Sequence, residues 1–152
     1  MGLKSKLPYH RRLVLLLLVS SWVLVACFIV FQYGREKHFK AEQLNSQLQL
    51  FNIQFLDALA GGANVDSLAR QHKKPFVEQR ITVIDLSGKV LFDSSSDTTS
   101  MTNHLDRPEV IQALENGTGY VIRRHSESTN LNYFYSATKN DSLIVRSAVP
   151  YS

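Results

Sequence analysis

Residues 80–93 read Arg-Ile-Thr-Val-Ile-Asp-Leu-Ser-Gly-Lys-Val-Leu-Phe-Asp, and this stretch decides the fold class of the chain. The β-branched residues between Ile81 and Ile84 favour a strand. Asp85 and Gly88 stand first and fourth in a four-residue segment, which is typical of a type I turn. Residues 89–93 then return as a second strand, so the stretch predicts an antiparallel hairpin.

Downstream of the hairpin the sequence predicts one helix and three more strands. The helix begins near Pro108, which suits a first turn; Asp106 can cap it, and Glu109 follows three residues later as in a capping box. Further strands are expected at 120–124, 131–137 and 143–149. Residues 80–152 are therefore expected to form an α+β domain, a five-stranded antiparallel sheet with flanking helices.

Residues 35–79, upstream of the hairpin, are expected to be a membrane-proximal helical segment. A helix over 35–60 carries an apolar stripe of residues spaced three or four apart, namely Leu44, Leu48, Phe51, Phe55 and Leu59. This stripe either packs on the domain that follows or forms a seam between two parallel copies. We expect weak parallel dimerisation through Leu44, Leu48, Phe51 and Phe55, and hence a homodimer.

The segment 13–31 holds nineteen residues without a charge. As a helix it spans about 28 Å, close to the thickness of a bilayer's hydrocarbon core. A transmembrane helix is therefore expected over residues 13–33. The tail 1–12 carries four fixed positive charges, and the positive-inside rule places such a tail in the cytoplasm. The expected location is the cell inner (plasma) membrane, with residues 35–152 outside the cytoplasm.

Two other interpretations of this segment stay open. A cleaved signal peptide would have a small-x-small site after the apolar run, and the residues after Phe31 offer none. A lipoprotein signal fits Leu24-Val25-Ala26-Cys27, but the apolar run continues past Cys27, where a mature lipoprotein normally begins with small or polar residues.

The positive charge of the chain is concentrated around the apolar segment. Residues 1–40 hold seven Lys or Arg against Glu36, whereas the other 112 residues hold ten Lys or Arg and twelve Asp or Glu. The basic character therefore belongs to the membrane flanks. A nucleic-acid partner, which would need a basic stripe on the folded part, is not expected.

Several phrases between residues 80 and 150 carry a family resemblance. They are residues 80–85, 88–94, 103–110, 117–119, 124–128, 133–137 and 145–150, of which Asn103-His104-Leu105-Asp106-Arg107-Pro108-Glu109 is the most specific. With them the chain resembles the extracytoplasmic PAS-like (Cache-like) sensor domains of bacterial membrane sensor histidine kinases, above all those of the phosphate-regulon sensor type.

The resemblance implies the N-terminal sensory input region of a two-component kinase, which detects an extracytoplasmic signal and starts a phosphorelay. Such kinases continue through a second membrane helix, a phosphoacceptor-histidine helix and an ATP-binding domain. This sequence stops at Ser152, so a fragment or a truncated product is expected, with no enzymatic activity of its own. A response regulator is then a partner only through the kinase core. Rival interpretations are an input module of a chemoreceptor or cyclic-dinucleotide enzyme, or a stand-alone accessory binding protein.

No catalytic, metal or cofactor site is expected. The five histidines lack the helical spacing of a zinc site, and the segment after residue 34 contains no cysteine. There is also no phosphate-binding lysine loop, Gly-rich dinucleotide turn or nucleophile elbow. His104, Asp106, Pro108 and Glu109 are expected to be structural residues of the helix start.

The arginines point to a different chemistry, because a guanidinium group holds carboxylate or phosphate with two hydrogen bonds. Adjacent strand residues Arg123 and Arg124 face opposite sides, so only one can reach a shared pocket. The expected anionic-ligand site lies on a sheet face, beside two tyrosines of one strand, and comprises Arg107, Arg123, Tyr133, Tyr135 and Arg146. The alternative is that these arginines are solvated or paired with Asp106 or Glu109.

Overall fold

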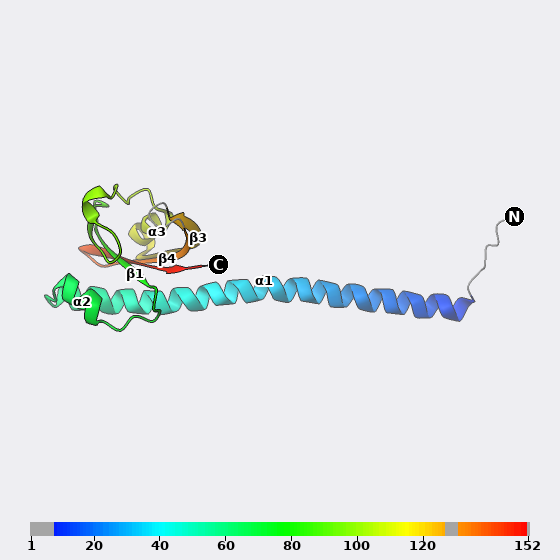
Figure 1. Cartoon of the computed structure of the whole chain (residues 1–152). Coiled ribbons are helices and arrows are strands. Elements are labelled where there is room, and N and C mark those ends of the chain that lie inside the picture. Colours follow the sequence, from blue (N-terminus) through cyan, green and yellow to red (C-terminus); the bar gives the residue numbers. More distant parts are fainter. Residues whose placement is uncertain (1–7, 127–130, 152) are drawn as a thin grey trace. The chain divides into compact units, whose positions relative to one another are not determined.

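The structure is a computed structural model that describes residues 8–126 and 131–151. Most of the basic tail and residues 127–128 of the quoted phrases lie outside the described residues. The chain divides into two compact units, Met1–Lys40 and Ala41–Ser152. Its elements, most of which are labelled in Figure 1, are α1 (Tyr9–Ala60), α2 (Val65–Gln71), β1 (Arg80–Asp85), β2 (Val90–Asp93), the 3-10 helix η1 (Thr98–Ser100), α3 (Pro108–Asn116), β3 (Thr118–Ser126), β4 (Leu131–Lys139) and β5 (Leu143–Pro150).

The first unit is the N-terminal part of α1. Among the described residues, α1 is the one helix that is long and apolar enough to cross a membrane. The large apolar side chains of its segment 13–31 are all exposed within this unit. Length and composition thus agree with the expected membrane segment, while the side of the membrane on which each end lies stays a prediction.

The second unit is built on a five-stranded antiparallel sheet with the order β2-β1-β5-β4-β3. The predicted α+β class and the hairpin at 80–93 are confirmed. The hairpin turn closes through the N–H of Gly88, which donates to the carbonyl of Asp85 at 3.0 Å. Gly88 has a φ of +85°, and a Cβ there would lie 2.5 Å from Leu105 Cγ, so this turn needs glycine.

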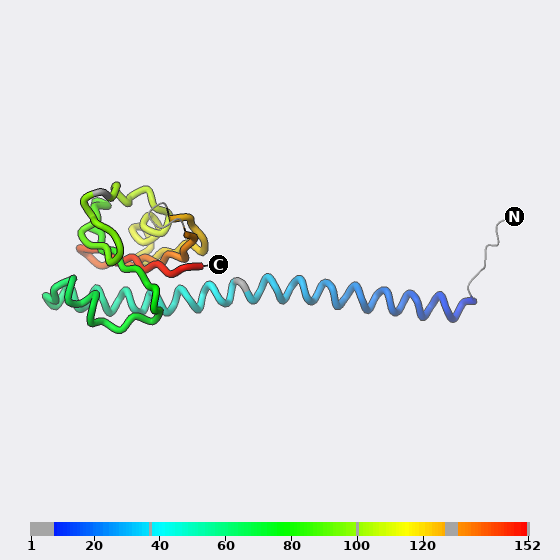
Figure 2. Tube along the Cα trace, viewed as in Figure 1, coloured from blue at the N-terminus to red at the C-terminus, as the bar shows by residue number. Residues whose placement is uncertain are grey.

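Helices cover both faces of the sheet (Figure 1). On one face, α1 from Ala41 onward and α2 pack against β1, β4 and β5, with Phe55, Ile81 and Val145 in the core. On the opposite face, α3 packs through Val110 and Ala113 against β1, β4 and β5. The Cα trace in Figure 2 follows the same layers. We call the face that α3 partly covers the outer face.

The apolar stripe of α1 serves the fold of the single chain. Leu48, Phe51 and Phe55 are at most 3% exposed because the sheet and α2 cover them, and Leu44 and Leu59 pack at the edges of the same clusters. A dimer seam through Leu44, Leu48, Phe51 and Phe55 is therefore wrong, since these side chains already have partners within the domain. The expected homodimer itself stays a prediction.

A polar contact fixes α1 on the sheet. Asn52 is fully buried among apolar side chains. Its Nδ2 donates to the carbonyl of Ser136 on β4 at 3.1 Å, and its Oδ1 accepts from the hydroxyl of Ser147 on β5 at 2.6 Å. Two turns earlier, Asn45 Oδ1 accepts from the hydroxyl of Ser136 at 2.8 Å. Because hydrogen bonds are directional, these contacts select one rotation and one register of α1 on the sheet.

We expect Asn52→Ala to lower the free energy of unfolding of the second unit by about 1–3 kcal/mol, because buried groups of Ser136 and Ser147 lose their partner. Urea denaturation of the detergent-solubilised chain, followed by circular dichroism, measures this. The control is Gln54→Ala on the exposed side of α1, with an expected change within about 0.5 kcal/mol. Equal losses in the two variants would contradict the anchoring role of Asn52.

Candidate functional site

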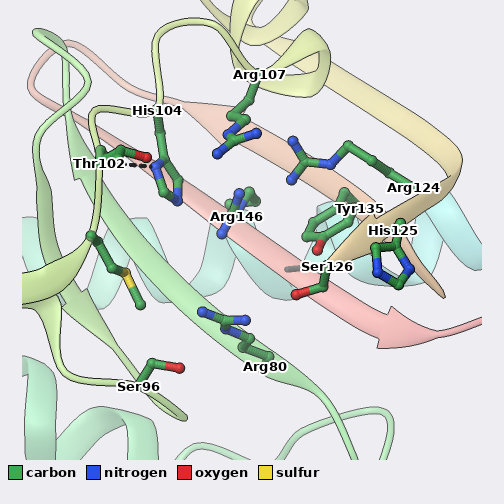
Figure 3. A pocket seen from close by; sticks show the side chains of 11 residues that line it. Arg80, Ser96, Thr102, His104, Arg107, Arg124, His125, Ser126, Tyr135 and Arg146 are labelled. Carbon is green, nitrogen blue, oxygen red and sulfur yellow. Dashed lines mark hydrogen bonds between the residues drawn. The ribbon is translucent and has the colours of Figure 1, made fainter. Parts of the chain in front are cut away.

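The outer face of the sheet carries a pocket of about 340 Å³. Its walls come from β1, β3, β4 and β5 and from the loop that joins β2 to α3 (Figure 3). Four arginines line it, namely Arg80, Arg107, Arg124 and Arg146, together with His104 and Tyr135. We call this the arginine pocket. It is the strongest candidate for a functional site because charged side chains from four separate elements converge on it.

Arg146 lies at the centre of the arginine pocket (Figure 3). It is 3% exposed, on the middle strand of the sheet. Strand pairing places it opposite Thr82 of β1, whose hydroxyl accepts from Arg146 Nη2 at 3.2 Å. Two residues along β1, Arg80 donates from Nε to both carboxylate oxygens of Asp93 at 3.0 Å. Alternation along two neighbouring strands therefore brings both guanidinium groups to one face.

Glu109 provides the buried negative charge at this place. Its side chain is fully buried, and its Oε1 lies 3.1 Å from Arg124 Nη2 and 3.3 Å from Arg146 Nη1. An uncompensated buried carboxylate is very costly, and these two arginines supply the counter-charges for Glu109 inside the domain. Glu109, in the first turn of α3, thus pairs with side chains of the sheet.

The predicted capping box at α3 is wrong. The residue before the helix is Arg107, with extended backbone and no capping side chain, and Pro108 takes the first helical position. Asp106 is therefore one residue too early to cap; it is 73% exposed and lies 3.4 Å from Arg107 Nε. Glu109 does not cap either, because its carboxylate is turned toward Arg124 and Arg146.

A β-bulge decides which of the two adjacent arginines reaches the pocket. Val121 pairs with Tyr135 whereas Arg124 pairs with Tyr133, so β3 has one extra residue between these pairs. Tyr120 and Ile122 face α1, and the extra residue turns Arg124 to the outer face. The structure places Arg124 at the pocket and leaves Arg123 exposed. The expectation of Arg123 at the site was wrong, because it assumed unbroken alternation.

Tyr135 forms the aromatic floor of the pocket. Its side chain is nearly fully buried, and its ring lies 4.3 Å from the guanidinium carbon of Arg124 and 5.0 Å from that of Arg146. Such cation–π contacts hold the planes of both guanidinium groups. Tyr133 packs against Tyr135 with 6.0 Å between ring centroids and is absent from the pocket lining. Of the five expected ligand residues, the structure brings together Arg107, Tyr135 and Arg146.

His104 lies at the pocket wall in its neutral form. Its Nδ1 lies 2.8 Å from the carbonyl of Thr102, which can only accept, so Nδ1 carries the hydrogen in the neutral ring. Burial lowers the pKa of His104, and the charge of Arg146 lowers it further. Arg107 and Arg124 act in the same direction, while the Thr102 carbonyl opposes them. The ring therefore adds no positive charge to the pocket near neutral pH.

Sequence reasoning missed Arg80 and Arg124 as pocket residues. The position of Arg80 could have been inferred from strand alternation. It stands two residues before Thr82 in the same strand, and Thr82 pairs with the expected site residue Arg146, so Arg80 shares their sheet face. Arg124 had no such signal, because nothing in the residue pattern marks the bulge. Among the described residues, no three His, Cys, Asp or Glu side chains form a group that could hold a metal ion.

No protein-family model matches the chain, and neither a curated protein nor a solved structure shows significant similarity to it. The function is therefore argued from the arginine pocket and from the sequence.

We expect Glu109→Gln to destabilise the second unit by about 3–5 kcal/mol, because Arg124 and Arg146 lose their buried counter-charge. The matched control is Asp106→Asn in the same loop, whose exposed ion pair is worth about 0–1 kcal/mol. Urea denaturation compares the two. Similar small losses would show that Glu109 contributes no more than a surface charge.

We expect the stability of the second unit to fall as the pH is lowered through the ordinary histidine pKa of 6.5. The folded-state pKa of His104 lies below that value, so in this range the unfolded chain binds the additional proton and unfolding is favoured. Melting temperatures between pH 8 and pH 5 measure the slope. His104→Gln should flatten it, and an unchanged slope in this variant would assign the effect to other groups.

Proposed function

We propose that this chain is the N-terminal sensory input region of a membrane sensor histidine kinase. In this role, α1 crosses the membrane, the second unit lies outside the cytoplasm, and the arginine pocket receives the signal. The observation that carries the proposal is the pocket itself. Charged side chains of three strands and of the loop before α3 line a hollow, where a molecule from solution can reach them.

The packing of α1 supports a role in transmission. β4 and β5 carry Tyr135 and Arg146 on the outer face, and their neighbours Ser136 and Ser147 bind α1 residues Asn45 and Asn52 on the other face. A change in the pocket therefore acts on the same two strands that hold α1. A sensor needs this kind of connection between its ligand site and the element that leaves the domain.

The choice of a kinase as the output rests on the resemblance of residues 80–150 to extracytoplasmic sensor domains of the phosphate-regulon type. The sheet with helices on both faces is the architecture which that resemblance implies. A response regulator would then be the downstream partner, through a kinase core that is not part of this sequence. The gene downstream of Ser152 tests this part: a second apolar span and a histidine-bearing helix support the kinase, and a chemoreceptor or cyclic-dinucleotide output would contradict it.

The topology is tested by reporter fusions after Ser152. An enzyme that folds only outside the cytoplasm should be active there, because the positive residues before the apolar segment 13–31 favour a cytoplasmic N-terminus. A reporter that works only in the cytoplasm should be inactive at the same position. Replacing Lys4, Lys6, Arg11 and Arg12 by Gln should weaken this preference. The reverse pattern in the unmodified chain would refute the outside location.

A further inference from the structure

We propose that the arginine pocket binds a small oxyanion carrying two negative charges, of the carboxylate or phosphate type, through Arg107, Arg124 and Arg146. This inference deepens the proposed sensory function and rests on it for its biological meaning. The binding itself can be tested without any signalling output.

The charge balance of the pocket favours a dianion. Among the residues that the structure describes, four guanidinium groups line it, and two carboxylates are buried beside them, those of Asp93 and Glu109. Asp106 is 73% exposed, so water screens much of its charge. Set against these two carboxylates, the four guanidinium groups leave an excess of two positive charges, and His104 is neutral. The excess belongs to the partly exposed Arg107 and Arg124, because the two buried arginines are matched by the two buried carboxylates. A ligand with two negative charges would complete the balance.

The hydrogen-bonding groups lead to the same chemistry. Within the described chain, Nε and Nη1 of Arg124 and Nε of Arg146 are buried and have no hydrogen-bond partner. A charged donor that is buried without an acceptor has lost its hydrogen bonds to water and gained none in return, which raises the free energy of the folded state. Carboxylate and phosphate oxygens match the spacing of the guanidinium donors. Figure 3 shows the guanidinium groups of Arg107, Arg124 and Arg146 directed toward a common region.

The site is organised before a ligand arrives. Glu109 Oε1 and the Tyr135 ring fix both Arg124 and Arg146, and Thr82 adds a further contact to Arg146. Binding therefore costs little side-chain ordering for these two residues. Arg107 differs, since its side chain is 28% exposed and its ion-pair partner lies in solvent. It is placed to exchange Asp106 for a ligand oxygen at the mouth of the pocket.

The size of the pocket limits the ligand. A volume of about 340 Å³ lies at the small end of the range for small-molecule sites, roughly 300–1,000 Å³. Inorganic phosphate, sulfate and short dicarboxylates share the required charge and fit this space.

The test uses the whole chain in detergent micelles, with isothermal titration calorimetry and thermal denaturation at constant ionic strength. The probes are sodium phosphate, sodium sulfate and sodium succinate, with sodium acetate and sodium chloride as singly charged controls. We expect at least one dianion to bind and to raise the melting temperature above that in chloride. A response to phosphate or sulfate alone assigns an inorganic oxyanion, and a response to succinate alone assigns a dicarboxylate.

Two matched variants test the residues. Arg107→Ala should weaken dianion binding by about tenfold or more, as expected for the loss of a charge-assisted hydrogen bond, without changing the melting temperature in chloride. Arg123→Ala removes the same charge from the exposed side of the bulge and should keep the affinity of the unmodified chain. Absence of binding by all three dianions, or equal weakening in both variants, would overturn the proposal. Neither result bears on the reporter fusions, so the proposed function would be judged separately.

Discussion

The buried carboxylate of Glu109 is the interaction on which the outer face of the sheet depends. A single oxygen of this side chain pairs with Arg124 of β3 and Arg146 of β5, which ties the first turn of α3 to two strands. The two guanidinium groups that this carboxylate binds are also the ones that stack on Tyr135. Buried ion pairs of this kind contribute little net stability, but removal of one partner is expensive. The cluster thus serves to specify one arrangement.

The hydrogen bonds of Asn45 and Asn52 on the opposite face also specify one arrangement, and burying these neutral groups requires less desolvation free energy than burying charges. Asn52 has neutral partners, so its burial requires directed hydrogen bonds and no counter-charge. Most of the area between α1 and the sheet is apolar and comes from residues such as Phe51 and Phe55. Apolar packing supplies the driving force there, while Asn52 and Asn45 define the register.

Local sequence signals predicted the elements well and their partners poorly. The hairpin with its turn at Gly88 and the helix start at Pro108 are marked by residues within a few positions of one another. The stripe of Leu48 and Phe55 predicted a helix face, but local sequence does not show which surface covers it. That surface comes from strands distant along the chain, with β4 and β5 against Leu48 and β1 and β5 against Phe55. Only part of the arginine pocket could be predicted, because its residues also come from elements that are distant along the chain. Arg146 and Tyr135 follow strand alternation, whereas Arg124 depends on a bulge that alternation conceals.

The central strand places its two polar anchors on consecutive residues. Arg146 faces Glu109 on one side of the sheet, and Ser147 faces Asn52 on the other. Successive strand residues are about 3.3 Å apart and point to opposite faces. The two contacts therefore connect α3 and α1 through one short segment of β5. A displacement of β5 along its axis would therefore strain both contacts together, and with them the seating of α3 and of α1 on the sheet.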